Sequence, residues 1–551
     1  MLPRYRRLGG KMLPRYRGPG GPHSVAQASL PVRGPGGKML PRYRGPGGPH
    51  SVAQASLPVR RPGVKMLPRY RGLGGPHSVA QASLPVRAPG GRPGSRTGER
   101  SLAMPVEVSR RNFLKGAAVG LGLGLGLSNQ VGAIASPVIG GRGAATVAPS
   151  DKIRLGFIGL AGRGYGNHLD WFGRHPDVEI AALCDVYPAH LDRAVKKVGG
   201  NVKAFHDFRQ LLDQPDVDAV VIATPPHWHA LISIAACDAG KDVYCEKPMS
   251  RYPAEARAMV RAAAVNRRVT QVGTQIHATE NYHKCVDVVR SGALGPITAI
   301  RNFCTMDDNS EGLGNPPDSA PLPGLDWDFW LGPAPKVPFN IGRFRDGMHR
   351  YFTDYVNSWL HELGPHIVDL PVWAAQLGQP LAVSASGGRF ATTSEATVPD
   401  TLDVLWEYPN MTMTWTLMQQ NAFNFGVGAP GAGRQLGIAF CGKKATLLAN
   451  YDICQVLDPN GKPVEGATYP AVIPPSPGHE REFLNSIKSR EETSCSFAND
   501  LPLHVALNLA HVSLRMGRKI HWDADKFEVI NDREANADIS PHYRGPWKLP
   551  R

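Results

Sequence analysis

The segment from Gly159 to Gly164 has the residue types and spacing of a turn that binds a dinucleotide pyrophosphate. It follows a short apolar run, Ile153–Ile158, which predicts a buried strand, and it precedes a predicted helix. A turn this tight needs small residues, so that backbone N–H groups at the helix N-terminus can approach the phosphates. Gly159, Ala161, Arg163 and Gly164 are therefore candidate cofactor-binding residues, although Ala161 stands where a second glycine is usual.

A carboxylate follows the next predicted strand, at the distance expected for recognition of the adenosine ribose. The apolar run Val178–Leu183 predicts that strand, and Asp185 lies 26 residues after Gly159. A carboxylate here can accept hydrogen bonds from the ribose and would repel a 2′-phosphate. The pattern favours NAD over NADP, and the alternative is that Asp185 caps a helix.

Apolar runs and helical patterns continue to alternate, which predicts a parallel sheet. Val217–Ala223 has the unbroken apolar composition of a central strand covered on both faces, and His227–Ala239 is predicted to be a helix. Asp242–Cys245 predicts a further strand, and Lys247 follows it closely. Because open α/β sheets bind ligands at the carboxyl ends of their strands, we expect Lys247 to lie at a binding site.

Several longer motifs resemble the glucose–fructose oxidoreductase/inositol dehydrogenase/rhizopine-catabolism (Gfo/Idh/MocA) family over about residues 152–551. The motifs are IATPPHWHALISIAACDAGKDVYCEKP (222–248), QVGTQ (271–275), DWDFWLGPAP (326–335), HELGPHIVDLPVW (361–373), GRKIHWD (517–523) and NDREANADISPHYRGPWKL (531–549). The last is similar to exported members. The resemblance implies an α/β protein with a Rossmann NAD(P)-binding domain at residues 150–273. It also implies a C-terminal α/β domain at 274–551, whose large, mostly antiparallel sheet supplies the substrate pocket and an oligomer surface.

The resemblance also implies a catalytic group for alcohol dehydrogenation, in which a base takes the hydroxyl proton while hydride leaves carbon. Lys247 and His366 would be the acid/base pair, with Glu362 as a supporting acid. The usual D-x-x-x-H motif of the family stands here as Glu362–His366, so the supporting acid is one methylene longer. The alternative is that Glu362 and His366 form a simple ion pair.

The local sequence adds expectations about this group. Pro365 favours the first position of a helix with Gly364 as its cap, which would put His366 in the first turn and keep its ring neutral. The resemblance implies a cis peptide before Pro248. It also implies a cofactor channel lined by four further residues besides Lys247. They are Thr224, His229, Glu246 and Gln275. Trp228 and Trp330 are expected to be packing residues.

The basic character of the chain belongs to its first 103 residues. The 551 residues carry a net charge of +16, but 19 of the 62 Lys and Arg residues and one of the 46 acidic residues precede Met104. The remainder is slightly acidic, which excludes a basic nucleic-acid-binding protein. Near-identical 27-residue copies begin at Lys11, Lys38 and Lys65. Because they are rich in Gly, Pro and Arg and have no amphipathic period, they predict either a spurious upstream extension or a disordered tail.

An export signal is expected directly after these repeats. Residues 109–115 read SRRNFLK and precede a glycine-rich apolar run, and Ala133–Ala135 fits a small-x-small cleavage pattern. Residues 104–135 therefore resemble a twin-arginine signal, with a linker at 136–149; the alternatives are a soluble stretch or a membrane span. If translation starts at Met104, the protein is expected in the periplasm or outside the cell, after contact with the twin-arginine export machinery. NAD would then be tightly bound, because little free cofactor is found there.

The expected function is oxidation or reduction of a hydroxyl or keto group of a sugar, polyol or glycoside, in a homodimer or homotetramer. One alternative is a glycoside hydrolase or lyase that uses tightly bound NAD for transient oxidation, and another is a non-catalytic NAD-binding sensor. The sequence shows no nucleic-acid motif and no metal-ligand spacing. Its eight cysteines form no C-x-x-C pair and are expected to be buried thiols. The alternating residues of Met411–Met418 predict a strand with one buried face.

Overall fold

The computed structural model describes residues 152–307, 313–428 and 434–550. The predicted repeats, signal and linker lie outside the described residues. Among the described residues, no helix has the length and apolar character needed to span a membrane. All eight cysteines are free thiols, six of them buried and two partly exposed.

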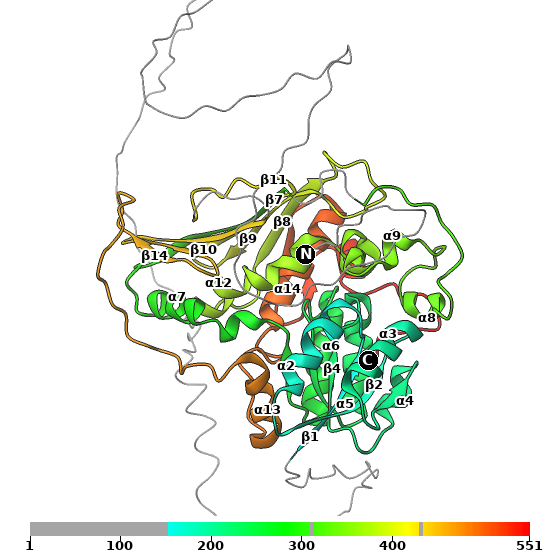
Figure 1. Cartoon of the computed structure of the whole chain (residues 1–551). Coiled ribbons are helices and arrows are strands. Elements are labelled where there is room, and N and C mark those ends of the chain that lie inside the picture. The colour runs from blue at the N-terminus through cyan, green and yellow to red at the C-terminus, as the bar shows by residue number, and fades with distance from the viewer. Residues whose placement is uncertain (1–151, 308–312, 429–433, 551) are drawn as a thin grey trace, which may run out of the picture. The chain divides into compact units, whose positions relative to one another are not determined.

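The first part of the described chain is a parallel sheet with the strand order β3-β2-β1-β4-β5-β6 (Figure 1). Its strands are β1 (Ile153–Ile158), β2 (Val178–Cys184), β3 (Lys203–Phe205), β4 (Ala219–Ile222), β5 (Asp242–Cys245) and β6 (Thr270–Val272). The strand order reverses between β1 and β4, which is the position where such sheets bind ligands. Both central strands are buried almost throughout, because helices cover both faces.

The helices of this part connect successive parallel strands. They are η1 (Gly164–His168), α2 (Leu169–Gly173), α3 (Pro188–Val198), α4 (Phe208–Leu212), η2 (Pro226–Trp228), α5 (His229–Asp238) and α6 (Pro253–Asn266). The predicted helix at 227–239 begins with the 3-10 turn η2, since Pro226 fixes the first turn and leaves no N–H to donate. The helical pattern after β1 starts at Gly162 and continues without a break to Gly173.

The second part is built on a ten-stranded sheet with the order β14-β13-β12-β7-β10-β9-β8-β15-β16, and β11 pairs with β7. Its strands are β7 (Ile297–Asp307), β8 (Ala382–Gly388), β9 (Thr401–Tyr408), β10 (Met411–Met418), β11 (Gln420–Asn421), β12 (Arg434–Gly442), β13 (Thr446–Ala449), β14 (Cys454–Leu457), β15 (Ile520–Asp523) and β16 (Glu528–Val529). Only β7 and β10 run parallel to one another. In β10, Met413, Trp415 and Leu417 are fully buried, as the alternating pattern predicts. The predicted fold class is confirmed.

Helices and short turns cover one face of this sheet and join it to the first part. They are η3 (Gln275–Ala278), α7 (Glu280–Arg290), α8 (Trp327–Leu331), α9 (Ile341–Phe344), η4 (Met348–Tyr351), α10 (Thr353–Val356), α11 (Trp359–Leu363), η5 (Gly364–His366), α12 (Asp369–Ala374), α13 (His479–Ser489), α14 (Leu501–Met516) and α15 (Arg533–Asp538). Helix α14 packs on the sheet, where Trp406 donates its indole N–H to the Ala506 carbonyl at 2.8 Å.

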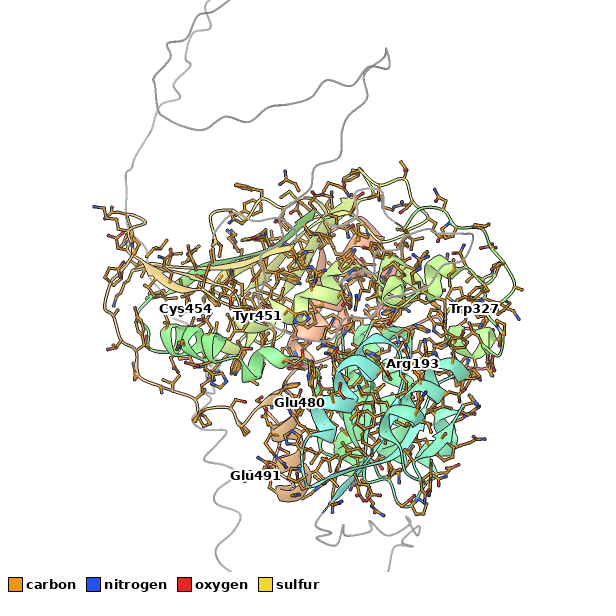
Figure 2. The ribbon with its side chains drawn as sticks, viewed as in Figure 1. Arg193, Trp327, Tyr451, Cys454, Glu480 and Glu491 are labelled. Atoms are coloured by element: carbon orange, nitrogen blue, oxygen red, sulfur yellow. The ribbon has the colours of Figure 1, made fainter. Side chains whose placement is uncertain are left out.

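Helix α13 belongs to the late part of the sequence but packs against the first sheet. Phe483 of α13 joins a buried cluster with Phe172 and Tyr244. Beyond the helix, Arg490 contacts Asp242 of β5 at 2.6 Å. Figure 2 shows Glu480 and Glu491 near the two ends of α13. The chain therefore returns to the parallel sheet after it has formed most strands of the ten-stranded sheet.

The close approach of the helix to the turn after β1 gives a stability prediction. A Cβ on Gly164 would overlap the carbonyl oxygen of Gly159, whereas a Cβ on Gly166 would meet nothing. We expect Gly164→Ala to lower the free energy of unfolding by about 1–3 kcal/mol, the usual effect of overpacking. Gly166→Ala is the matched control, and we expect it to be neutral or to stabilise by about 0.5–1 kcal/mol. Denaturant unfolding of both variants measures the difference, and equal effects would contradict the predicted close contact.

Candidate active site

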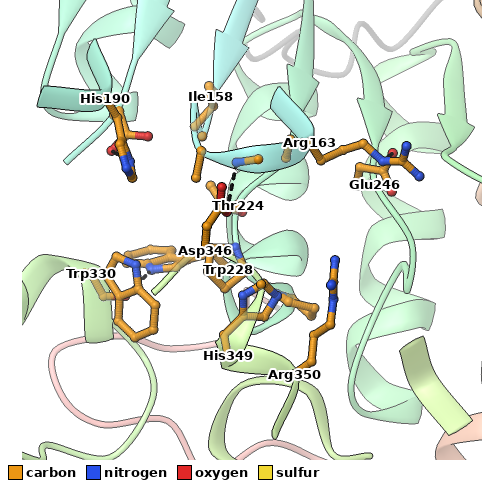
Figure 3. Close-up of a pocket in the computed structure, with 18 of the residues that line it drawn as sticks. Ile158, Arg163, His190, Thr224, Trp228, Glu246, Trp330, Asp346, His349 and Arg350 are labelled. Carbon is orange, nitrogen blue, oxygen red and sulfur yellow. Dashed lines mark hydrogen bonds and ion pairs between the residues drawn. The ribbon is translucent and has the colours of Figure 1, made fainter. Parts of the chain in front are cut away.

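A cavity of about 650 Å³ lies at the carboxyl ends of the parallel strands. The turn after β1, Asp185, Thr224 and Lys247 line one side. The other side comes from the second part of the chain and includes Asp346, His349, Arg350, Glu362 and His366. Figure 3 shows Arg163 and Glu246 together at one side of this cavity, with His349 and Arg350 facing them.

The turn after β1 has the geometry that an approaching phosphate requires. Gly159 has a φ of +90°, and a Cβ there would lie 2.7 Å from backbone atoms of Ala223 and Thr224. Only glycine tolerates both conditions. Ala161, Gly162 and Arg163 line the cavity, and the helix begins at Gly162 with its first N–H groups unpaired within the helix. This turn can therefore present backbone donors to an anion.

Asp185 and Thr224 lie where they could contact the rest of a dinucleotide. The Asp185 carboxylate, at the end of β2, accepts hydrogen bonds from the N–H groups of Leu160 at 2.7 Å and Tyr187 at 2.9 Å. These bonds orient the carboxylate at the cavity edge and leave lone pairs for ribose hydroxyls. The Thr224 hydroxyl is buried and has no hydrogen-bond partner among the described residues. A buried hydroxyl with no partner fits a site that holds a polar ligand.

Three of the residues predicted to bind the cofactor do not line the cavity. Gly164 lies beneath the Gly159 carbonyl and allows the helix to pack there. The ring nitrogens of His229 lie 2.7 Å from the carbonyl oxygen of Pro248 and 2.8 Å from that of Thr224, so this ring ties together the ends of β4 and β5. Gln275 donates to Glu246 Oε1 at 3.4 Å. These three residues therefore contact and support residues of the cavity wall but do not line the cavity themselves.

Glu246 is a buried carboxylate held by cationic and hydrogen-bonding partners. Its Oε1 lies 2.8 Å from Nε2 of His168 and 3.2 Å from Nε of Arg163. Burial alone would raise the pKa of Glu246, but the His168 hydrogen bond and the Arg163 and Lys247 charges lower that pKa below its usual range. Glu246 is therefore ionised, and it fixes the Arg163 side chain beside the glycine turn.

Lys247 and Glu362 form a buried ion pair, and Arg350 also contacts the Glu362 carboxylate. Lys247 Nζ lies 2.8 Å from Glu362 Oε1 and donates to the Glu362 carbonyl at 3.0 Å, while Arg350 Nε lies 2.9 Å from the same Oε1. The peptide before Pro248 is cis, as the resemblance implied. Burial lowers the pKa of Lys247 although Glu362 opposes this shift. Burial would raise the pKa of Glu362, but Arg350 and Lys247 lower it to about 2.

His366 faces the same cavity, but its local structure differs from the expectation. Gly364–His366 is a 3-10 turn between α11 and α12, so the predicted helix start at Pro365 is wrong. Helix α11 ends at Leu363, and α12 begins only at Asp369. Burial, followed by repulsion from Lys247, lowers the pKa of His366 to about 3. The ring is therefore neutral, as predicted, for a different physical reason.

Several residues of the site had no signal in the sequence. Asp346 precedes the 3-10 turn η4, which carries His349 and Arg350, and all three lie outside the motifs of the family. Tyr451 follows β13 (Figure 2), and its hydroxyl lies 2.7 Å from Nδ1 of His366. Asp346 and Tyr451 meet their partners through contacts between distant parts of the chain, which residue spacing does not show. Trp228 and Trp330 pack as predicted, since the Trp228 indole N–H donates to the Trp330 carbonyl, and both also line the cavity.

A separate buried group has the residue types of a metal site. His277, Asp369 and Asp500 offer ligand atoms within 4.8 Å of one another in the described part of the chain. His277 Nε2 lies 2.9 Å from Asp369 Oδ2, and Asp500 accepts from the Thr274 hydroxyl at 2.9 Å. Burial, followed by the charge of Asp369, raises the pKa of Asp500 to about 8. A raised pKa favours the protonated form of Asp500 beside the Asp369 carboxylate.

Comparison with known protein families finds matches in both parts of the chain. Residues 153–274 match the oxidoreductase family with an NAD-binding Rossmann fold, and residues 467–549 match its C-terminal alpha/beta domain. A glycosyl hydrolase family 109 protein from Shewanella baltica is 31% identical over 207 residues, which are 34% of this chain and 44% of the relative. An alpha-N-acetylgalactosaminidase from Shewanella oneidensis is 29% identical over 204 residues, again 34% and 44% of the two chains. The matched region thus spans less than half of these relatives.

Solved structures share the fold at low sequence identity. A levoglucosan dehydrogenase in complex with NADH has a TM-score of 0.50 and 19% identity, covering 67% of this chain and 99% of the other. An oxidoreductase domain protein from Kribbella flavida has a TM-score of 0.51 and 20% identity, covering 67% and 99%. An oxidoreductase from Agrobacterium radiobacter in complex with NAD+, L-tartaric acid and magnesium has a TM-score of 0.50 and 18% identity, covering 67% and 98%. Residues 153–274 therefore match an NAD-binding Rossmann domain, which supports NAD as the cofactor, and residues 467–549 match the C-terminal domain of the same oxidoreductases; the solved structures share the fold.

Proposed function

We propose that this protein oxidises or reduces a hydroxyl or keto group of a sugar, polyol or glycoside with NAD. The observation that carries the proposal is the convergence of Lys247, Glu362 and His366 on the cavity that also contains the glycine turn. Dehydrogenation needs a proton acceptor beside a cofactor that takes hydride, and this cavity has room for both. The similar fold of a levoglucosan dehydrogenase supports a carbohydrate substrate.

Lys247 is the residue that accepts the hydroxyl proton in this proposal. A neutral lysine amine has two N–H donors and one lone pair, and the two oxygens of Glu362 that it contacts occupy both donors. The lone pair is then free to take a proton. The lowered pKa of Lys247 increases the neutral fraction near neutral pH, as a general base requires. NAD, when bound, supplies the hydride acceptor.

His366 orients the substrate oxygen. Burial raises the pKa of the Tyr451 hydroxyl to about 12, so this hydroxyl stays protonated and can donate to Nδ1 of His366. The neutral ring then carries its proton on Nε2, which can donate to an oxygen of the substrate. Lys247 and His366 thus form an acid/base pair with distinct tasks.

A second candidate function is glycoside cleavage through transient oxidation. The curated relatives named as glycosyl hydrolase family 109 proteins and as an alpha-N-acetylgalactosaminidase favour this candidate. An assay for release of nitrophenol from its α-N-acetylgalactosaminide separates the two reactions. Cleavage without net formation of NADH would establish the second candidate, and net NADH formation from a free sugar or polyol would establish the first.

We further propose that the protein is exported through a twin-arginine signal when translation starts at Met104, and that it retains NAD tightly. The paired arginines at 110–111 and the glycine-rich run behind them support this. Fractionation of cells that express the chain from Met104 tests export, with Arg110→Lys and Arg111→Lys together as the variant that should stay in the cytoplasm.

Removal of Lys247 or His366 tests the catalytic assignment. We expect Lys247→Ala and His366→Ala each to lower turnover by about 10²–10⁴-fold, the usual contribution of a general acid or base. A carbohydrate panel read at the absorbance band of NADH measures turnover, and NAD released on denaturation measures cofactor binding. Lys336→Ala, at an exposed lysine, is the matched control. Full turnover in either active-site variant would refute the mechanism.

The pH dependence of oxidation should follow the ionisation of Lys247. Because the neutral amine is the active form, kcat/KM should rise tenfold per pH unit below the pKa of Lys247 and level off above it. The midpoint should lie below 10.5, the ordinary pKa of lysine. His366, with a pKa of about 3, should add no limb between pH 5 and 8. A rate that falls as pH rises through this range would be inconsistent with Lys247 as the base.

Arg350 should influence the pH at which kcat/KM rises. Its charge lowers the pKa of Lys247, and it shares Oε1 of Glu362 with the lysine. We expect Arg350→Gln to raise the pKa of Lys247, so that activity at neutral pH falls and recovers at higher pH. Arg345→Gln, at an exposed neighbour, is the control and should leave the profile in place. An unchanged midpoint in Arg350→Gln would show that the shared oxygen does not tune the lysine.

A further inference from the structure

An acidic side chain from the second part of the chain contacts the glycine turn of the first. The Gly162 N–H donates to Oδ1 of Asp346 at 2.9 Å, across 184 residues of sequence. Both residues line the cavity. In Figure 3, Asp346 lies between the segment that carries Arg163 and the side chains of His349 and Arg350.

This N–H is one that a dinucleotide phosphate should use. Gly162 is the first residue of the helix after β1, within the turn whose backbone donors face the cavity. Rossmann domains place the cofactor pyrophosphate at this helix N-terminus. A Cβ on Gly162 would lie only 2.9 Å from the Asp346 carboxylate, so the carboxylate sits directly against the turn. The Asp346 oxygen thus occupies the position expected for a phosphate oxygen.

The described contacts of Asp346 point to the turn. The Gly162 N–H is the hydrogen-bond partner of its carboxylate among the described residues. Arg163 and Arg350 contact other carboxylates, Glu246 and Glu362, although the charge of Asp346 also raises the pKa of Arg350. The turn itself therefore attracts this negative charge, as helix N-termini attract anions.

We propose that Asp346 determines the affinity of the enzyme for NAD, because its carboxylate holds the pyrophosphate position in the cofactor-free chain and leaves when the cofactor binds. The carboxylate and the pyrophosphate carry charges of the same sign and compete for the same donor. Asp346 thus makes NAD binding weaker than it would be with a neutral side chain at this position.

Nucleotide titration of the full chain tests the competition. The chain is stripped of bound nucleotide with charcoal and titrated calorimetrically with NAD+ and, separately, with adenosine, which has no phosphate. Because like charges placed together repel, Asp346→Ala and Asp346→Asn should bind NAD+ about tenfold more tightly or better. Both variants should bind adenosine as the wild type does. Because the Asp346 side chain is exposed, neither change is expected to affect folding.

A matched charge control and a structure complete the test. Asp354→Asn removes a charge from a neighbouring helix and should leave NAD+ affinity unchanged. Equal tightening in that variant, or unchanged or weaker NAD+ binding in both Asp346 variants, would overturn the proposal. In a crystal structure with NAD bound, the Gly162–Asp346 hydrogen bond should be absent; its persistence beside a bound pyrophosphate would overturn the proposal as well. These readouts concern cofactor binding only, so they are independent of the proposed sugar reaction.

Discussion

One carboxylate oxygen, Oε1 of Glu362, contacts two cations in the buried cavity. Lys247 Nζ and Arg350 Nε both lie within 3 Å of it, at 2.8 and 2.9 Å. Arginine keeps its charge at any ordinary pH, whereas burial and the Arg350 charge lower the pKa of the buried Lys247. Of these two cations, Lys247 is therefore the one that can lose a proton. The chemistry proposed for the site depends on this difference between the two cations, because it allows the lysine to act as a base.

The fold keeps these groups in place through contacts behind the cavity. Lys247 follows β5, and the segment after Pro248 is held by α14, because the Met249 N–H donates to Nε2 of His504 at 2.9 Å. Burial lowers the pKa of His504 to about 4, so its ring stays neutral and can accept that bond. Glu362 lies on α11, whose first turn is capped by the Ser358 hydroxyl. Helix α14 thus supports the lysine, and a capped helix supports its carboxylate.

The sequence predicted the parts of this arrangement that lie in continuous motifs. The apolar strands, the glycine turn and the lysine after β5 follow from local composition, and the fold class was confirmed. The helix start at Pro365 was wrong because the Gly364–His366 segment packs as a 3-10 turn between two short helices. The neutrality of His366 was predicted, but its cause is burial beside Lys247 and not a helix end. Asp346 and Tyr451 could not be predicted, since their roles depend on contacts between segments far apart in sequence, and Arg350 lies outside the motifs of the family.

In this cluster, the Lys247 ammonium should lose its proton at a lower pH than an ordinary lysine does. The most direct test is an NMR titration of the chain with ¹⁵N-labelled lysine, with the Lys247 signal assigned by comparison with Lys247→Ala. The account predicts that this amine titrates clearly below 10.5, the ordinary lysine pKa. A Lys247 amine that stays protonated up to or beyond that value would contradict it.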